Sequence, residues 1–549
     1  MKNMLLLLLF YAASSFAATY YCDAQAVSSG DGSINNPYKS IAAGMSVLSS
    51  GDTLFIRGDQ AGNGRIYNEK ISVSSSAASG KDNAPIVVSA YLGEIVRLMP
   101  SARSSIYANY WEFKDFILDM GAHADDAIRV YGDHNTFRNL EVTNGQRDGF
   151  DMSDASYNLI ENCTIHYFNR NDQYDAHGII MDGGVGNTFR GNVIYDCKGD
   201  CIQLYKSKVN SETLIEDNDL YTTFGGGSEN AIDMKGTQSC TIRNNKMHGF
   251  RNAEDSDGVA LKINKNSDNV LIEYNEIYDS NGGFRISGGE TQNIRFRYNV
   301  VHDIYLDGSP DKYGYGVQFD GVSDITLSSN TFAHIPGPLF WIASRGATNI
   351  TMENNIFYDS NSFKGSTADF NGNVQIDYNG WYQTKQSISG AHDVVGDNPG
   401  FVDEGAYDFK LTESSSAINA GNPAAGTDFP GQRIDLGAFE FQGTPTGIQN
   451  EIKSASGFYL APNYPNPFNP STTIQFYMQQ AGWVKLNVFD ITGRRIATLI
   501  NALRVPGAHR VAFHPNAAAS GIYFYNLTVY SQDKGRIIFQ KSRQMTFLK

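Results

Sequence analysis

One pattern of apolar and polar residues recurs from about residue 110 to residue 360. An apolar residue is followed by two polar residues, an asparagine or its substitute, one variable residue and a second apolar residue, as in Ile272-Glu-Tyr-Asn275-Glu-Ile277. The asparagines are Asn192, Asn218, Asn245, Asn275, Asn299, Asn330 and Asn355, with Cys163 in the same place one repeat earlier. The 24 to 31 residues between successive asparagines predict a solenoid. We expect each asparagine to lie at a bend, to tolerate left-handed backbone geometry and to hydrogen-bond its stacked copies.

A second pattern precedes the asparagines and consists of short runs in which apolar residues alternate with others. Examples are Asp200-Cys-Ile-Gln-Leu204, Asn230-Ala-Ile-Asp-Met234 and Asp257-Gly-Val-Ala-Leu261. Such alternation predicts strands with one buried face. Each coil should therefore contribute at least two short strands, and the sequence has no long run of helical periodicity.

These repeats resemble the right-handed β-helix repeat family, which includes pectate-lyase-like enzymes, over about half of the chain. The resemblance implies an all-β chain whose right-handed parallel β-helix, a solenoid, occupies residues 111–395. The ends of a solenoid need caps, since they would otherwise expose core and strand edges. We assign the caps to residues 19–110, which also hold the first coils, and to residues 396–442.

Both ends of the chain carry export signals. A charged start, an apolar run and small residues predict a signal peptide over residues 1–18. After a linker at residues 443–457, the motifs Tyr464-Pro-Asn-Pro-Phe-Asn-Pro470 and Val488-Phe-Asp-Ile-Thr-Gly493 resemble a type IX secretion sorting domain at residues 458–549. The resemblance implies a small β-sandwich, contact with the type IX secretion machinery, and a secreted or cell-surface protein of a Gram-negative bacterium. A carbohydrate-binding sandwich is the alternative for this tail.

Composition excludes other classes of function. The 549 residues carry a formal net charge of −15 and no block of lysine and arginine, which argues against nucleic acid as a partner. After the N-terminal run, no stretch has the roughly 18 apolar residues of a membrane-spanning helix, so we expect no stable membrane insertion. The five cysteines fit neither a disulfide framework nor a zinc pattern. We expect them to be buried free thiols, with a Cys197–Cys201 bond as the alternative.

Candidate chemistry lies on the outward positions of the predicted strands. Because an acidic chain repels a polyanion, an acidic polysaccharide would need a local basic patch or bridging calcium. Stacked strands lie about 4.8 Å apart, so Asp233, Lys235, Lys262 and Arg285 should form one patch. The pattern places Lys262 beside Lys235, where a neighbouring cation would lower the pKa of each lysine and favour a base. The predicted substrate-binding residues are Gln203, Tyr205 and Asp233.

Acidic and amide side chains gather where the predicted strands begin. These residues are Asp126, Asp148, His177, Asp200, Asn230 and Asp257, with Glu229 beside them. Stacked carboxylates repel unless a cation joins them, and oxygen ligands suit calcium. We predict a calcium site from Asp200, Glu229, Asn230 and Asp257, with turn capping as the alternative role. The segment Tyr174-Asp-Ala-His177 offers a rival acid and base and resembles mannuronan epimerases.

A lysine or arginine base together with calcium can cleave a uronate polysaccharide by β-elimination. Here the sequence resembles the chondroitinase B and alginate lyase family, in which an acidic calcium ligand precedes the base lysine by five residues and an arginine lies on the next coil. Asp257 and Lys262 have this spacing, as do Asn230 and Lys235. The resemblance implies catalytic roles for Lys262, Lys235 and Arg285, although Arg285 stands two positions early and no histidine follows it. We therefore predict a calcium-assisted lyase for an acidic glycan.

Two other classes of function stay open. A glycoside hydrolase would use paired aspartates, Asp151 with Asp182 or Asp182 with Asp233. A non-catalytic surface adhesin would instead bind glycans on exposed aromatic rings, namely Tyr131, Tyr205 and Trp341.

Overall fold

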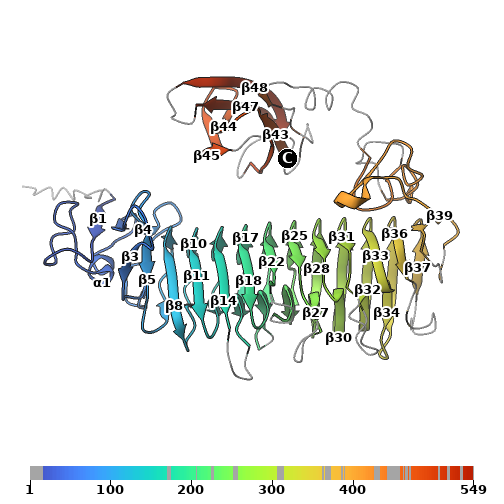
Figure 1. Cartoon of the computed structure of the whole chain (residues 1–549), viewed down its shortest axis with the longest axis horizontal. Helices are drawn as coiled ribbons and strands as arrows, with labels where there is room; N and C mark the ends of the chain where they lie inside the picture. Colours follow the sequence, from blue (N-terminus) through green and yellow to red (C-terminus); the bar gives the residue numbers. More distant parts are fainter. Residues whose placement is uncertain are drawn as a thin grey trace, which may run out of the picture. The chain divides into compact units, whose positions relative to one another are not determined.

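The chain forms two compact units, Met1–Phe441 and Gln442–Lys549. A computed structural model describes residues 17–169, 175–205, 207–223, 228–251, 257–305, 314–361, 364, 373–384, 388, 390–425, 433–441, 458–460, 463, 468, 472–504, 507–515, 520–531 and 536–547. The first unit is a right-handed parallel β-solenoid of about 10 turns (Figure 1), which confirms the predicted fold class. The linker, Tyr174 and all but the last two residues of the signal peptide lie outside the described residues.

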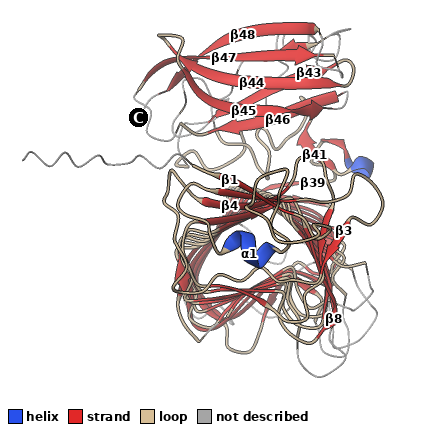
Figure 2. Ribbon diagram, turned by 90° about the vertical axis from the view of Figure 1, so that its left-hand side faces the viewer, coloured by secondary structure: helices blue, strands red, loops and turns tan. Residues whose placement is uncertain are grey.

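Three runs of parallel strands build the solenoid (Figure 2). The first run holds β6 (Ser104–Ile106), β9 (Ile128–Val130), β12 (Phe150–Ser153), β15 (Ile179–Asp182), β19 (Ile202–Leu204), β23 (Ile232–Lys235), β27 (Val259–Asn264), the beginnings of β30 (Gly282–Arg297) and β32 (Tyr315–Ser328), and β34 (Phe340–Ile342). The second run holds β1 (Thr19–Cys22), β2 (Thr53–Ile56), β4 (Ile86–Ala90), β7 (Trp111–Lys114), β10 (Thr136–Arg138), β13 (Leu159–Glu161), β17 (Thr188–Arg190), β21 (Leu214–Glu216), β25 (Thr241–Arg243), β28 (Asp268–Glu273), the ends of β30 and β32, β35 (Ala347–Glu353) and β37 (Val374–Asp377). The short strands β16 (Gly184–Val185), β20 (Asn210–Ser211) and β24 (Thr237–Gln238) lie between these two runs along the chain.

The third run is a separate 14-stranded sheet. It holds β3 (Arg65–Tyr67), β5 (Val96–Leu98), β8 (Ile117–His123), β11 (Glu141–Gly145), β14 (Thr164–Phe168), β18 (Val193–Cys197), β22 (Asp219–Tyr221), β26 (Lys246–His248), β29 (Glu276–Tyr278), β31 (Val300–His302), β33 (Thr331–Pro338), β36 (Ile356–Asn361), β38 (Gly380–Tyr382) and β39 (Val394–Gly396). One helix, α1 (Ile41–Met45), lies across the N-terminal end of the coils and buries Ile41 and Met45 in their core (Figure 2).

Alternation along each strand creates the core. In β19, β23 and β27 the inward residues are Ile202 and Leu204, Ile232 and Met234, and Leu261 and Ile263, and all six are fully buried. Because successive side chains of a strand point to opposite faces, the residues between them point away from the core. All five cysteines are free and buried, as expected.

A ladder of asparagines holds the coils in register. The main-chain N–H of Asn245 donates to Oδ1 of Asn275 at 3.0 Å, and Asn275 donates likewise to Asn299 at 2.9 Å. The ladder begins at Cys163, whose N–H donates to Asn192, and continues to Asn379. The expectation that the asparagines adopt left-handed backbone geometry was wrong. That conformation belongs to the residue before each asparagine, such as Tyr274 with φ of 57°. The asparagine side chain instead supplies the hydrogen bonds that this bend needs.

Charged groups attach the C-terminal cap to the coils. The cap contains β40 (Phe401–Asp403), the 3-10 helix η2 (Glu404–Ala406) and β41 (Asp408–Leu411). His334 binds Glu404 of this cap at 3.1 Å, and Asp303 lies between His302 and His334. The pKa of Asp303 is lowered, since hydrogen bonds from the two histidines outweigh its burial, and the pKa of both histidines is raised by their acidic partners.

The second unit has two antiparallel sheets that share one apolar core. One sheet holds β42 (Tyr459–Leu460), β43 (Thr472–Met478) and β46 (Gly507–Phe513), and the other holds β45 (Arg495–Arg504), β44 (Gly482–Asp490), β47 (Gly521–Tyr530) and β48 (Ile537–Phe547). No helix among the described residues is long and apolar enough to cross a membrane.

Replacing one member of the ladder should destabilise the solenoid. Asn275→Ala leaves the buried amides of Asn245 without their acceptor, so we expect the free energy of unfolding to fall by at least about 2 kcal/mol. Urea unfolding followed by circular dichroism measures this change. The exposed Asn63→Ala is the control, and equal stability of the two variants would contradict the role of the ladder.

The cap contact should weaken at alkaline pH. The pKa values of His302 and His334 are raised and that of Asp303 is lowered. The contribution of these charge pairs to the free energy of unfolding is therefore full between pH 3.8, the ordinary aspartate pKa, and pH 6.5, the ordinary histidine pKa. It declines as the pH rises through the raised histidine pKa values. The thermal midpoint of His334→Gln should therefore lie below that of the unaltered protein near pH 6, and the gap should narrow as pH rises. A gap that is constant with pH would contradict a charge-based contact.

Candidate functional site

Outward side chains of the first run form one continuous column, which we call the central column. In register it consists of Arg129, Asp151, Ile180, Gln203, Asp233, Lys262, Arg285, Gln318, Trp341 and Lys364. The predicted patch of Asp233, Lys262 and Arg285 therefore lies on three successive strands. Neighbours in the column are separated by one strand spacing, about 4.8 Å.

The register corrects the predicted position of Lys262. The pattern aligned Ala260 with Asp233 and Lys262 with Lys235, but Lys262 pairs with Asp233, and Asn264 pairs with Lys235. In Val259-Ala-Leu261-Lys-Ile263 three apolar residues alternate, and the inward pair is the later one, Leu261 and Ile263. Arg285 is thus in register with Lys262 rather than two positions early.

Lys262 and Arg285 share one carboxylate. The Arg285 guanidinium binds Asp257 at 2.6 Å, and the Lys262 ammonium lies 3.8 Å from the same carboxylate. The side chains of Lys262 and Arg285 are 20% and 28% exposed, so a substrate in solution can reach both. Asp257, predicted as a metal ligand, is here the partner of two cations.

Lys235 has a different environment from the one that its predicted role requires. Its ammonium binds Asp233 at 2.8 Å, and Asp233 also accepts a hydrogen bond from Asn264 at 2.8 Å. Burial alone would lower the pKa of Lys235, but the charge and hydrogen bond of Asp233 outweigh it and raise that pKa. The expected lowering by a neighbouring lysine was wrong, because Asp233 and not Lys262 is its close partner.

The other predicted metal ligands gather at the start of β19 and β23. Asp200 is fully buried and accepts hydrogen bonds from Asn230 at 2.6 Å and from Gln203 at 2.8 Å. Oδ1 of Asn230 is buried and has no hydrogen-bond partner among the described residues. Burial, followed by the charges of Asp200 and Asp175, raises the pKa of Glu229 to about 8. These groups form an oxygen-rich cluster at the strand entrances.

Two of the three predicted substrate-binding residues are less accessible than expected. Gln203 and Asp233 point away from the core but are only 5% and 4% exposed, because Asp200, Lys235 and Asn264 bind and cover them. They bind neighbouring side chains through these contacts. Tyr205 is 37% exposed, as predicted for a residue that meets a substrate.

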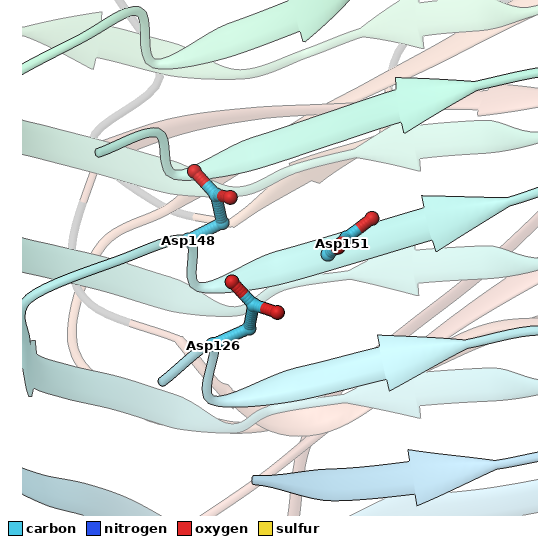
Figure 3. Close-up of side chains that lie close together, drawn as sticks. All are labelled: Asp126, Asp148 and Asp151. Atoms are coloured by element: carbon cyan, nitrogen blue, oxygen red, sulfur yellow. The ribbon is translucent and has the colours of Figure 1, made fainter. Parts of the chain in front are cut away.

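A further group of carboxylates lies on β9 and β12 (Figure 3). Asp126 and Asp148 stand just before β9 and β12, Asp151 lies on β12 itself, and ligand atoms of all three lie within 4.8 Å of one another. Two arginines already bind these carboxylates. Arg129 binds Asp126 at 2.6 Å and Asp151 at 2.5 Å, and Arg147 lies 3.4 Å from Asp126. The sequence pattern did not reveal this network, because it depends on which coils are stacked.

His177 connects the two acidic groups. Its Nδ1 lies 2.8 Å from Asp148, and its Nε2 lies 3.9 Å from Asp200. Burial alone would lower the pKa of His177, but these carboxylates, Asp148 above all, raise it to about 9. At neutral pH the ring is therefore a buried cation between two carboxylates, which is a poor state for the general base of an epimerase.

Residues expected to serve a hydrolase or an adhesin are also engaged. Asp182, of the predicted hydrolase pair, accepts hydrogen bonds from Ser207 and from the main chain of Lys208. The Tyr131 ring is stacked on Tyr107 at 4.5 Å, and the Lys364 ammonium lies 4.2 Å above the ring of Trp341. Each of these two rings therefore already has a neighbour on one face, Tyr107 for Tyr131 and Lys364 for Trp341.

Two hollows of the surface lie beside the central column rather than on it. One, of about 820 Å³, is lined by Lys208, Lys265 and Glu290, and the other, of about 700 Å³, by Asn293, Arg295 and neighbouring polar residues. Neither contains Lys262 or Arg285. We place the candidate site on the open face of the column, because the paired charges lie there and a polysaccharide needs no enclosed cavity.

Comparison with known families agrees with this architecture. A family model described as right-handed beta helix region matches residues 105–229 and 177–357, and a secretion system C-terminal sorting domain matches residues 463–540. Pectate lyase L of Dickeya dadantii (strain 3937) is 24% identical over 453 residues, covering 77% of this chain and 90% of that protein.

Solved structures with a similar fold include two polysaccharide lyases. Pectate lyase Pel9A matches with 18% identity and a TM-score of 0.39, covering 78% of this chain and 97% of its own. The PL6 family alginate lyase AlyGC matches with 14% identity and a TM-score of 0.47, covering 64% of this chain and 52% of its own. The arrangement of its strands and the two family models together identify the chain as a right-handed parallel β-helix protein with a C-terminal secretion-system sorting domain.

Proposed function

We propose that this protein is a secreted polysaccharide lyase that cleaves an acidic, uronate-containing glycan by calcium-assisted β-elimination. The observation that carries the proposal is the register of Lys262 with Arg285 on neighbouring strands, with the carboxylate of Asp257 between them. Similarity to pectate lyase L supports the reaction class, and the sorting domain supports action outside the cell.

Lys262 is the proposed general base. β-Elimination removes the proton from the carbon next to the uronate carboxylate, so a basic nitrogen must approach that carbon from an accessible surface. The proton passes to Nζ of Lys262 in its neutral amine form, and the electron pair of the broken C–H bond moves toward the carboxylate. The bond to the glycosidic oxygen then breaks, a carbon–carbon double bond forms, and the departing oxygen takes up a proton from water.

Arg285 is proposed to bind the substrate carboxylate. A guanidinium beside the reacting sugar stabilises the negative charge that grows as the proton leaves. Asp257 holds this guanidinium near Lys262. Lys235, through Asp233, is proposed to position the strand beside the base, while Gln203 and Tyr205 border the site.

Residues that would hold calcium lie one and two strands away from the base, before β23 and β19. Asp200, Glu229 and Asn230 fit a hard cation, because they supply oxygen atoms, the Oδ1 of Asn230 has no hydrogen bond among the described residues, and burial with like charge raises the pKa of Glu229. Calcium bound there would help to neutralise the substrate carboxylate. Asp257 is the fourth proposed ligand only if it leaves its two cationic partners.

Loss of the base should abolish elimination. We expect Lys262→Ala to lower kcat/KM on polygalacturonate or alginate by at least about a hundredfold, because general-base catalysis contributes this much. The measurement is the ultraviolet absorbance of the unsaturated product. Lys246→Ala, which changes an exposed lysine of the third run, is the matched control and should keep full activity.

Further variants distinguish a different base and a different reaction from this proposal. Retained activity in Lys262→Ala with loss in Lys235→Ala would move the base to Lys235. Cleavage that yields no unsaturated product, survives a chelator and is lost in Asp182→Asn would replace the lyase with a hydrolase.

Calcium binding can be tested without turnover. We expect Asn230→Ala to weaken calcium binding at least about tenfold, or about 1.4 kcal/mol, because it removes a ligand oxygen. Calorimetric titration of the metal-stripped protein measures the affinity. Asn264→Ala is the matched control, since Asn264 is also buried and also binds a carboxylate, that of Asp233. Equal weakening in both variants would contradict a specific role for Asn230.

A further inference from the structure

The charge of the central column changes sign between Asp233 and Lys262. Toward the N-terminal coils the column and its neighbours carry Asp233, Asp200, Glu229 and Asp151, partly neutralised by cations. Toward the C-terminal coils the column carries Lys262, Arg285 and finally Lys364. An acidic polysaccharide is therefore attracted more strongly to the C-terminal side of the base than to the N-terminal side.

Lys364 joins the column through a single bridge to Trp341. Its main-chain N–H donates to Phe340 at 2.8 Å, and its carbonyl accepts from Ile342 at 3.0 Å, so it occupies the next strand position. Its ammonium lies 4.2 Å above the indole ring of Trp341, and Tyr315 packs edge-on against the same indole at 5.5 Å. A cation over an aromatic face is attracted to it, so the indole positions the ammonium.

Three buried polar atoms near Arg285 and Trp341 have no hydrogen-bond partner among the described residues. Gln318 is 4% exposed, and its Oε1 has no hydrogen-bond partner within the described part of the chain. The same holds for the hydroxyl of Tyr315 and for Nε of Arg285. The nearby carboxylate of Asp320 is neutralised by Arg345, which binds it through two nitrogen atoms. This stretch therefore keeps a positive balance among its described residues.

We infer that Lys364 is a second binding point for a substrate carboxylate, and that the polysaccharide extends from Lys262 over Arg285, Gln318 and Trp341 to reach it. This inference rests on the proposed function, because it takes the acidic glycan as substrate. Four strand spacings separate Lys262 from Lys364, about 19 Å in all. One strand spacing is about 4.8 Å, and a pyranose unit of an extended polysaccharide is of similar length, so about four sugars span the distance between the two main-chain positions.

The arrangement makes binding depend on substrate length. A short oligomer held at Lys262 and Arg285 ends before Lys364, whereas a long one places a carboxylate on it. On the opposite side Lys235 is already bound to Asp233 and Arg129 to Asp151, so these two cations are engaged by carboxylates of the protein itself. Longer substrates should thus gain affinity through the C-terminal coils alone.

The test compares trisaccharides and heptasaccharides of galacturonate and of mannuronate. Lys364→Gln should raise KM for the heptasaccharide about tenfold, leave kcat unchanged and leave the trisaccharide unaffected, while Lys364→Arg should restore the KM. Lys246→Gln is the matched control. An unchanged heptasaccharide KM, or an equal loss with both lengths, would overturn the inference.

A binding measurement separates this inference from the proposed reaction. Calorimetric titration of the Lys262→Ala protein with each heptasaccharide needs no turnover. Binding that weakens about tenfold when Lys364→Gln is added supports the second binding point even if no elimination is ever detected. Equal affinity with and without Lys364→Gln would overturn it even if the protein proves to be a lyase.

Discussion

The vertical register of the coils is the constraint on which the rest of the structure depends. In a parallel solenoid the neighbours of a side chain lie about one coil earlier and one coil later in the sequence, at a separation of about 4.8 Å. The asparagine ladder fixes this register, because each buried amide both accepts from one coil and donates to the next. A slip of two residues would preserve the alternation of the core and yet exchange every outward neighbour.

Lys262 shows how much chemistry follows from such a shift. Aligned beside Lys235, it would lie next to a cation. Aligned beside Asp233, it lies between a carboxylate and Arg285 in one column. The same residues thus produce a pair of competing bases in one register and a base with a carboxylate-binding guanidinium in the other.

The fold could be predicted from the sequence because its signals are local and repeated. The spacing of Asn192 to Asn355 and the alternation in the strands each recur over many successive coils, so errors at one coil are corrected by the others. The site could be predicted only in part, because it depends on pairings across coils. Three alternating apolar residues, Val259, Leu261 and Ile263, leave the local alignment ambiguous, and the chain pattern does not reveal that the bend belongs to Tyr274 rather than Asn275. Lys364 has no strand pattern around it, since it enters the column through one isolated bridge.

An acidic protein can present a surface suited to an acidic polymer because its charges are paired locally. Asp233 is held by Lys235 and Asn264, Asp126 and Asp151 by Arg129, and Asp320 by Arg345, so these carboxylates project little field along the column. Close pairs act at short range, while screening by salt removes most of the effect of distant surface charges. The net charge of −15 therefore does not decide what the column binds. What the column binds is decided by the order of charges along it. Lys235 is already paired with Asp233. The charges left to face a substrate are those of Lys262 and Arg285, which share the carboxylate of Asp257.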